Sequence, residues 1–422
     1  MTQQNGTALR RNVVAGTVGN VLEWYDFAVY GYLAPIIGKI FFPADDPTAS
    51  LLAAFGVFAV GFLSRPIGGM IFGHFGDKIG RKRVLIISVL MMGAGTFAIG
   101  VLPGFAEIGV AAAVLLVILR ILQGIAVGGE YSGSVVFLAE HAPPARRGLL
   151  ASWPDFGSGV GFLMGSGAGA AVGLIIGEAA LEAWGWRIPF LLGALIAVAG
   201  ILFRRHMTES PVCEEMTRVA GSPVIAALRH HWQPIFKMVG LILVNSVGFY
   251  MLFVYATSYL TQKMHISTAR ALDINTGALV VYVVLTPLAA ALSDRIGRKP
   301  LLYFAALSTL VLSWPLWALM HHHSLLFILA GQIGFAVIFA IGFAVTSATM
   351  VEMLPAEVRC SGVAIGYNIC LGLFGGTTPL VSTYLVARTA DDFAPVYILM
   401  AAAAISFAVT LRLPETARKP LI

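Results

Sequence analysis

The stretch GHFGDKIGRK at residues 73–82 decides the fold, because it recurs as ALSDRIGRK at residues 291–299. Each copy lies between two long apolar runs, and the aspartates of the two copies, Asp77 and Asp294, are 217 residues apart. A basic loop that repeats between apolar runs is typical of a membrane unit that has been duplicated.

A second pattern recurs at nearly the same offset. Its two copies have identical spacing and are 212 residues apart: Glu140, Pro143 and Arg147, then Glu352, Pro355 and Arg359. One such match could arise by chance, whereas two matches at nearly one offset predict an internal duplication of the whole chain.

The composition indicates a membrane protein. The chain of 422 residues is 58% hydrophobic and 11% charged, whereas a soluble domain carries about 25% charged residues. The three cysteines, Cys213, Cys360 and Cys370, have neither metal-ligand spacing nor the pattern of a disulfide framework. Glu23 and Asp26 interrupt the first apolar run, so we expect it to be a retained helix and not a cleaved signal peptide.

Twelve apolar segments are long enough to span a bilayer. They cover residues 15–38, 50–74, 84–103, 109–138, 148–174, 187–203, 235–262, 271–292, 300–319, 324–350, 361–386 and 393–412. We predict an all-α membrane protein in which twelve transmembrane helices form two pseudo-symmetric six-helix bundles. The expected boundaries are 1–204 for the N-terminal bundle, 205–233 for a polar cytoplasmic linker and 234–422 for the C-terminal bundle.

The positive charges predict the orientation. If both termini and the linker are cytoplasmic, 20 of the 27 Lys and Arg residues lie on the cytoplasmic side and 5 lie outside. The remaining two, Arg65 and Arg120, fall within apolar segments. This asymmetry follows the positive-inside rule, so we expect a multi-pass protein of the inner membrane with both termini in the cytoplasm. It also accounts for the basic pI without a nucleic-acid partner.

Several motifs resemble those of the major facilitator superfamily. The loop at 73–82 resembles the superfamily's loop between its second and third helices, and RILQG at 120–124 resembles its fourth-helix motif. Four further segments, at 23–27, 65–69, 128–131 and 184–190, are similar to the metabolite:proton symporters, whose members carry proline/betaine, 2-oxoglutarate, citrate or shikimate. The resemblance implies the twelve-helix fold and proton-coupled uptake.

Within that group, the local motifs SWPDFGS at 152–158 and YML at 250–252 are most similar to the proline/betaine carriers. Two departures are notable. Those carriers have a lysine at the position of Arg120, where the carboxylate carriers have arginine. They also have a long C-terminal extension, whereas this sequence ends at Ile422. The substrate class therefore stays open between an organic carboxylate and a zwitterionic osmolyte.

Ionisable residues within the apolar segments are functional candidates, because a charge at the bilayer centre costs about 2.5–3.5 kcal/mol on insertion scales. Six of them lie well inside a segment, and all six fall in the first five segments, so we expect the N-terminal bundle to carry proton and charge recognition. The candidates for proton coupling are Asp26, Glu23, Glu130 and Asp155. Glu23, Asp26 and Tyr30 share one helical face.

A buried arginine stays charged and offers a forked donor to a carboxylate. The candidates for substrate binding are these arginines and the polar or aromatic residues expected to line the cavity: Arg120, Arg65, Gln123, Tyr30, Tyr131, Asn245, Tyr250, Tyr367 and Asn368. Neutral side chains such as Asn245 are also common in ordinary interhelical hydrogen bonds.

The acidic and basic residues of the repeats predict a gate. Ion pairs among them would hold the two bundles together on the cytoplasmic side and would break when that side opens. The gating candidates are Asp77, Arg81, Arg147, Asp294, Arg298, Glu352 and Arg359.

The favoured function is proton-coupled symport of a small organic carboxylate or zwitterionic osmolyte by alternating access, by a protein that acts as a monomer and uses neither cofactor nor metal. A proton-coupled exporter of cationic drugs is the alternative, because Glu23, Asp26 and Asp155 could attract cations. A membrane sensor is disfavoured because no sizeable soluble domain is present. An enzyme is disfavoured because no pairing of nucleophile and base appears.

Overall fold

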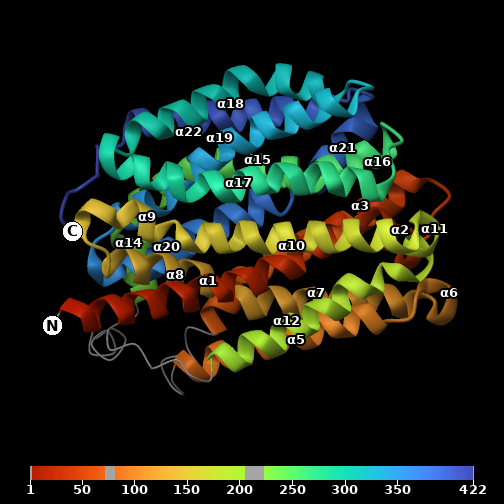
Figure 1. Cartoon of the computed structure of the whole chain (residues 1–422), viewed down its shortest axis with the longest axis horizontal. Helices are drawn as coiled ribbons and strands as arrows, with labels where there is room; N and C mark the ends of the chain where they lie inside the picture. Colours follow the sequence, from red (N-terminus) through yellow and green to blue (C-terminus); the bar gives the residue numbers. More distant parts are fainter. Residues whose placement is uncertain (1, 72–80, 205–222, 422) are drawn as a thin grey trace.

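The computed structural model describes residues 2–71, 81–204 and 223–421, and every regular element in these ranges is a helix. The membrane fold predicted from the sequence is confirmed. Within the described ranges, twelve helical passages run along the long axis of the molecule (Figure 1). Nine of them are long and apolar enough to qualify as spans on length and hydropathy alone.

The first six passages form the N half. They are α1 (Thr2–Tyr32) with the short α2 (Ala34–Phe41), α3 (Pro47–Leu63) continuing to Ile71, α5 (Arg81–Val101), α7 (Val110–Val127) with α8 (Glu130–Glu140), α9 (Arg147–Ala151) with α10 (Trp153–Ile176), and α12 (Arg187–Arg204). The turns between them include α6 (Phe105–Ile108) and α11 (Glu178–Ala180).

The last six passages form the C half. They are α15 (Trp232–Tyr250) with α16 (Ala256–Gln262), α17 (Thr268–Ile296), α18 (Lys299–Met320), α19 (Leu325–Glu352), α20 (Ala356–Cys370) with α21 (Thr378–Thr389), and α22 (Ala394–Leu411). Part of the expected linker is helical, since α14 (Pro223–His230) lies within residues 205–233. This helix packs its buried Ala227 against Ile235 and Val358.

Local sequence explains where the passages break. Pro35, Gly128 and Pro154 lie at or next to the breaks that follow α1, α7 and α9. Proline lacks an amide hydrogen and glycine is a weak helix former, so each favours a helix end at its position. Gly297 ends α17 with φ +104°, a conformation that residues with a Cβ rarely adopt. That residue is the glycine of the second copy of the basic loop and corresponds to Gly80 of the first copy.

Wider helical turns interrupt two passages of the C half. π-helical segments lie at Met251–Tyr255 and Leu371–Gly375, each in the middle of a passage. Such segments are uncommon and cluster at functional sites, because they re-aim the side chains that flank them. Both contact the N half, the first against α1 and the second against α3.

Helices of the two halves pack along a shared interface. Across it, α10 packs on α17, α3 on α21, and α8 on α20. The peripheral pairs are α5 with α12 in the N half and α18 with α22 in the C half, at opposite edges of the molecule (Figure 1). These outer helices expose apolar side chains such as Leu90, Phe97, Phe304 and Val311.

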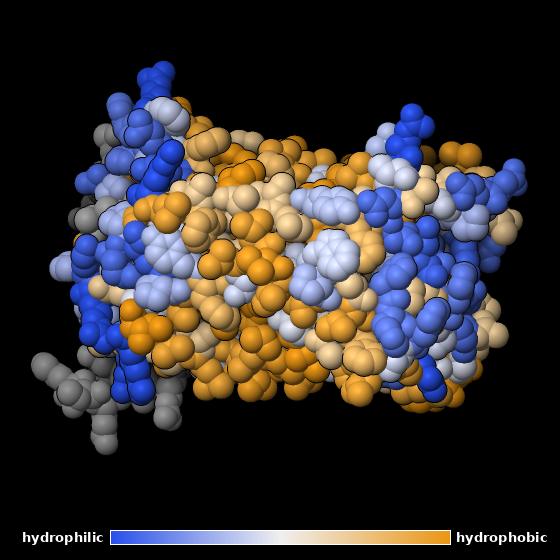
Figure 2. All heavy atoms as spheres, turned by 90° about the horizontal axis from the view of Figure 1, so that it is seen from above, coloured by the Kyte–Doolittle hydropathy of each residue, from blue (hydrophilic) through white to orange (hydrophobic). Residues whose placement is uncertain are grey.

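The surface shows the pattern of a membrane protein. Figure 2 shows an apolar band across the middle of the face in view, with polar side chains gathered at the two ends of the molecule. The end that carries α9 and the C-terminus is called the α9 end below, and the opposite end, with α6 and α11, is called the α11 end (Figure 1). Lipid tails offer no hydrogen bonds, so the apolar band is the part that a bilayer would cover.

Candidate functional site

A carboxylate and a guanidinium lie side by side in the interior of the N half. Arg120 of α7 donates from Nη1 to Asp26 Oδ2 of α1 at 3.3 Å and to Gln123 Oε1 at 3.0 Å. Thr96 of α5 donates to the other Asp26 oxygen at 2.5 Å, and Gln123 donates back to Thr96 at 3.1 Å. This Asp26 site, formed by Asp26, Thr96, Arg120 and Gln123, is almost completely shielded from solvent.

The guanidinium of Arg120 is held by aromatic rings on its other side. Its central carbon lies 4.4 Å from the ring centroid of Tyr30 and 4.6 Å from that of Phe27. Tyr30 in turn donates its hydroxyl to the carbonyl of Ala54 at 3.1 Å. Cation–π contact and the ion pair together keep Arg120 inside the N half and aimed at Asp26.

A second buried arginine lies at the interface between the halves. Arg65 donates from Nη2 to Glu23 Oε1 at 2.7 Å, and from Nε to Asn368 Oδ1 of the C half at 3.3 Å. Asn368 completes the bridge by donating to the carbonyl of Gly128 at 2.8 Å. Arg65 is 1% exposed, and its third nitrogen, Nη1, has no hydrogen-bond partner among the described residues.

Aromatic side chains from both halves surround Arg65. The site formed by Glu23, Arg65 and Asn368 with the rings of Trp24, Phe62 and Tyr250 is called the Arg65 site below. The Arg65 guanidinium lies 5.1 Å from the Trp24 ring and 5.6 Å from the Phe62 ring. Phe62 meets Tyr250 of the C half edge to face at 5.1 Å, and the Tyr250 hydroxyl also lacks a described partner. The site therefore combines a buried cation, an unsatisfied donor and several ring faces.

The third acidic candidate bonds to the C half directly. Asp155 of α10 forms hydrogen bonds at 2.5 Å with the hydroxyl of Tyr131 of α8 and with that of Ser347 of α19. The Tyr131 ring stacks on Tyr367 of α20 with centroids 4.2 Å apart. Pro154 occupies the first turn of α10, where its missing amide hydrogen leaves no helix bond broken.

The fourth acidic candidate, Glu130, lies near the Asp26 site. It begins α8, after the two glycines that end α7, and lines a cavity of about 20 Å³ inside the N half together with Glu23, Asp26 and Ser88. That volume is enough for about one water molecule. The cavity therefore places a wettable space against the Asp26 site.

Asn245 forms its hydrogen bond within the C half. It donates to Thr346 within the C half at 2.9 Å, and Gly342 of α19 packs directly on it. Of the nine predicted substrate-binding residues, the structure brings six to the Asp26 and Arg65 sites: Arg120, Gln123, Tyr30, Arg65, Asn368 and Tyr250. Tyr131 and Tyr367 lie at Asp155.

The repeated Glu and Arg residues exchange partners across the interface at the α9 end. Arg147 of the N half donates to Glu352 of the C half at 3.2 Å, and Arg359 of the C half donates to Glu140 of the N half at 2.6 Å. The two copies of the sequence pattern thus form reciprocal ion pairs, as two-fold pseudo-symmetry requires.

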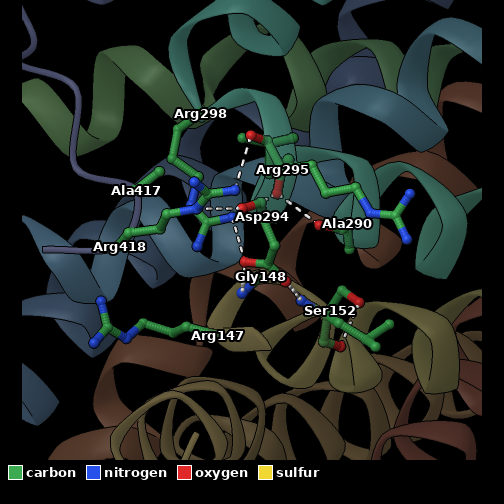
Figure 3. Close-up of polar contacts among 12 residues, drawn as sticks. Arg147, Gly148, Ser152, Ala290, Asp294, Arg295, Arg298, Ala417 and Arg418 are labelled. Carbon is green, nitrogen blue, oxygen red and sulfur yellow. Dashed lines mark hydrogen bonds and ion pairs between the residues drawn. The ribbon is translucent and has the colours of Figure 1, made fainter. Parts of the chain in front are cut away.

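Asp294 adds a bond to the main chain of the other half. Its two oxygens accept from the amides of Gly148 and Leu149 in α9, at 2.8 and 2.9 Å, and Arg298 donates to it at 2.9 Å (Figure 3). A Cβ on Gly148 would lie only 2.3 Å from Arg298 Nη1, so only glycine permits this approach. Arg298 also donates to Glu352, which itself pairs with Arg147. The connected residues Arg147, Asp294, Arg298 and Glu352 are called the α9-end cluster below.

The C-terminal segment lies over this cluster. Thr416 donates to Glu352 at 2.6 Å, and Arg147 donates to the carbonyl of Lys419 at 2.9 Å. Glu415 accepts from the amides of Arg298 and Lys299 at the start of α18. Burial of Glu415 acts to raise its pKa, but these and two further backbone amides outweigh it and hold the pKa below the usual value.

Two gating candidates cannot be placed. Asp77 lies outside the described residues, and nothing is described of the side chain of Arg81. The other five all belong to the α9-end cluster or to its reciprocal pairs.

Sequence reasoning missed several residues. Thr96, Thr346 and Ser347 are hydroxyl residues in apolar helices, and nothing in the sequence separates them from ordinary packing residues. Glu140 was visible as part of the repeat but was not predicted to be a gating residue. Glu415 carries no pattern at all, because its partners are backbone amides of another loop.

Comparison with known sequences places the chain among transporters. The sequence pattern of the family described as "Sugar (and other) transporter" matches residues 12–213 and 215–422. A proline/betaine transporter of Salmonella typhimurium is 35% identical and a glycine betaine/proline/ectoine/pipecolic acid transporter of Dickeya dadantii is 36% identical. Both alignments cover 98% of this chain and 85% of the relative.

Solved structures show the same fold. The proton:xylose symporter XylE bound to 6-bromo-6-deoxy-D-glucose matches with a TM-score of 0.78 and 20% identity, over 99% of this chain and 98% of that one. A partially occluded, inward-open form of XylE from E. coli matches with a TM-score of 0.76 and 19% identity, over 98% and 99%. The architecture of the two bundles is thus that of the major facilitator superfamily.

Asp294→Asn is predicted to loosen the closure between the halves at the α9 end. Asparagine keeps one acceptor for α9 but loses the ion pair with Arg298. A loss of about 1–3 kcal/mol would shift a two-state population by a factor of about 5–150. Spin labels on the exposed residues Ala145 and Ala356, in a background without native cysteines, should show a larger long-distance population.

Asp273→Asn is the matched control, because Asp273 is exposed near the other end of the same helix α17. Gly148→Ala should act like Asp294→Asn, since the added methyl group forces the same contact apart. Distances identical to those of the wild type in both Asp294→Asn and Gly148→Ala would mean that this contact does not hold the halves together.

Proposed function

This chain belongs to the sugar (and other) transporter family of the major facilitator superfamily, and we propose that it imports a zwitterionic osmolyte of the proline and betaine class together with protons. The observation that carries the substrate class is the Arg65 site. It offers one unsatisfied guanidinium nitrogen beside aromatic ring faces at the interface between the halves.

The Arg65 site has the two features that a zwitterion needs. Nη1 of Arg65 is a charge-assisted donor for a carboxylate, and the unpartnered Tyr250 hydroxyl can add a second donor. The rings of Trp24, Phe62 and Tyr250 offer π faces to a secondary or quaternary ammonium. We infer that the substrate carboxylate binds Arg65 and that its ammonium rests against these rings.

The charge balance favours a zwitterion over the other candidates. Each of the two buried arginines is paired with a carboxylate, Arg65 with Glu23 and Arg120 with Asp26, so these pairs leave no excess positive charge for a dicarboxylate. They likewise leave no excess negative charge for a purely cationic drug, whereas a zwitterion carries no net charge. The relatives named as proline/betaine and glycine betaine/proline/ectoine/pipecolic acid transporters support the same choice.

The Asp26 site is the proposed proton carrier. Asp26 can be neutral, with Arg120 then held by Gln123 and the aromatic rings, or ionised and paired with Arg120. The adjacent cavity, with room for about one water, gives protons a way to reach the carboxylate. Glu23 and Glu130 line the same cavity and are proposed as neighbours in this route.

Alternating access follows from the arrangement of the two halves. We propose that residues 1–204 and 234–422 rock about the shared interface, joined by 205–233, with the α9 end on the cytoplasmic side. The excess of Lys and Arg near the α9 end supports this orientation. The α9-end cluster then closes the cytoplasmic side while the substrate site faces outward.

Uptake of labelled proline or glycine betaine into proteoliposomes is predicted to depend on an inward proton gradient. The reason is that paired acids in the membrane interior can carry protons, and no other coupling ion is implied by the site. A protonophore should abolish accumulation above the external concentration. Accumulation that resists the protonophore and requires sodium would refute the proton coupling.

Asp26→Asn is predicted to abolish uphill uptake while leaving exchange of labelled for unlabelled substrate intact. Asparagine has nearly the same shape and can still accept from Thr96, but it cannot release a proton. Counterflow and gradient-driven uptake would be measured on the same proteoliposomes. Asp273→Asn, an exposed position, serves as control, and undiminished uphill uptake in Asp26→Asn would move the proton to another acid.

Arg65→Lys is predicted to weaken substrate affinity about 10–150-fold, the equivalent of one charge-assisted hydrogen bond of about 1.5–3 kcal/mol. Lysine keeps the charge but cannot bond Glu23, Asn368 and a substrate in one plane. Binding would be measured calorimetrically on purified protein. Arg120→Lys is the comparison, because it should impair coupling with a smaller loss of affinity; the reverse order would place the carboxylate on Arg120.

A further inference from the structure

Three polar side chains from the two halves, Asp155, Tyr131 and Ser347, contact one another in a closed ring. Tyr131 Oη and Ser347 Oγ each lie 2.5 Å from an oxygen of Asp155, and these two hydroxyl oxygens lie 3.0 Å from each other. Asp155 and Tyr131 belong to the N half, and Ser347 belongs to the C half. The ring is therefore a contact between the halves as well as a polar cluster.

Counting hydrogens shows what the ring requires. A ring in which all three contacts are hydrogen bonds needs three hydrogens, one in each contact. The hydroxyls of Tyr131 and Ser347 supply two of them. An ionised Asp155 supplies none, so one contact would place two lone pairs against each other, whereas a protonated Asp155 supplies the third hydrogen and closes the ring.

The surroundings of Asp155 also favour the neutral acid. Its side chain is 2% exposed, and no Lys, Arg or His in the described ranges forms an ion pair with it. The titratable groups that face it are the phenols of Tyr131, Tyr282 and Tyr367. Burying an ionised carboxylate without a cation is costly, and protonation avoids that cost.

Other groups near Asp155 do not change this balance. On the α1 side, Asn20 packs against Gly157 and is neutral. Arg65 and Glu23 lie beyond Tyr367 and are paired with each other. The amide of Phe156 is bonded to the Ser152 carbonyl, and the amide of Ser152 to Gly148, so α9 and α10 form a nearly continuous helix here.

The ring lies next to the α9-end cluster. Ser347 precedes Glu352 by five residues on α19, which corresponds to about 7–8 Å along a helix. Asp155 follows Arg147 by eight residues, or about 12 Å along the nearly continuous helix of α9 and α10. Separation of Arg147 from Glu352 would therefore also pull Ser347 away from Asp155.

We propose that Asp155 is a second proton-binding site, distinct from the Asp26 site, which holds its proton while the halves are closed at the α9 end and gives it to water when that end opens. The inference rests on the proposed transport cycle for its role in uptake. In that cycle, opening toward the cytoplasm breaks the bond from Ser347, admits water and lets the carboxyl group ionise. Linkage then requires that a higher pH favours the open α9 end.

The test is a distance measurement on purified, full-length protein in nanodiscs. Spin labels on Ala145 and Ala356, both exposed at the α9 end, report the separation of the halves without any need for transport. In a cysteine-free background, the long-distance population of the otherwise unmodified protein should rise as the pH is raised. Failure of the proposed symport would appear in the uptake assays and leave this measurement unaffected.

Two variants should shift the distance distribution in opposite directions. Asp155→Asn keeps a donor and an acceptor in the ring but cannot titrate, so the distances should stay short at every pH. Ser347→Ala keeps the acid but removes the bond across the interface, so the long distance should be enriched at every pH. Asp273→Asn, at an exposed position of α17, is the control and should retain the slope of the background protein.

The proposal is overturned if the background protein shows no pH dependence, or if Asp155→Asn retains the same dependence. An infrared spectrum gives a second readout that does not depend on the labels. A band of protonated carboxyl groups should be present at neutral pH and should be weaker in Asp155→Asn, since Asp26 can also contribute to it. Retention of the entire band in that variant would contradict protonation of Asp155.

Discussion

The ion pair between Asp26 and Arg120 is the interaction on which the proposed chemistry depends. A lone charge in the membrane interior costs about 2.5–3.5 kcal/mol on insertion scales, and removal of one partner from a buried pair costs about 3–5 kcal/mol. Two opposite charges on α1 and α7, with Thr96 and Gln123 as bonded neighbours, remove most of that cost. In the proposed transport cycle the same pair gains and loses one proton, so residues that stabilise the fold would also couple transport to protons.

The two halves have the same architecture, but they contribute different kinds of polar residues to the interior. At the α9 end, the repeated residues are used symmetrically, since Arg147 pairs with Glu352 and Arg359 pairs with Glu140. In the membrane interior, the N half supplies the charges, while the C half presents neutral groups such as Asn368 and Ser347 to them. Motion of the C half can thus break hydrogen bonds to buried acids without separating the ion pairs inside the N half.

Some of these contacts could be predicted from the sequence and some could not. The face shared by Glu23 and Asp26 follows from helical spacing, and the gating role of Arg147 and Glu352 was predicted from the repeat. The hydrogen-bond partners of the acids could not be predicted from the sequence, because Thr96 and Asp26 are 70 residues apart and Asp155 and Ser347 are 192 residues apart. Nothing local to a hydroxyl residue in an apolar helix records which acid it will meet.

The sequence by itself determined that the chain spans a membrane, that it has twelve helical passages and that it is built from two related halves. These properties depend on apolar length, charge counts and repeats, which are linear features of the chain. Only the tertiary structure decided that Arg120 pairs with Asp26 and is enclosed in one half, whereas Arg65 pairs with Glu23 and bonds to Asn368 of the other half. Both are arginines in apolar segments, and their roles separate only when packing determines which partners lie within a few ångströms.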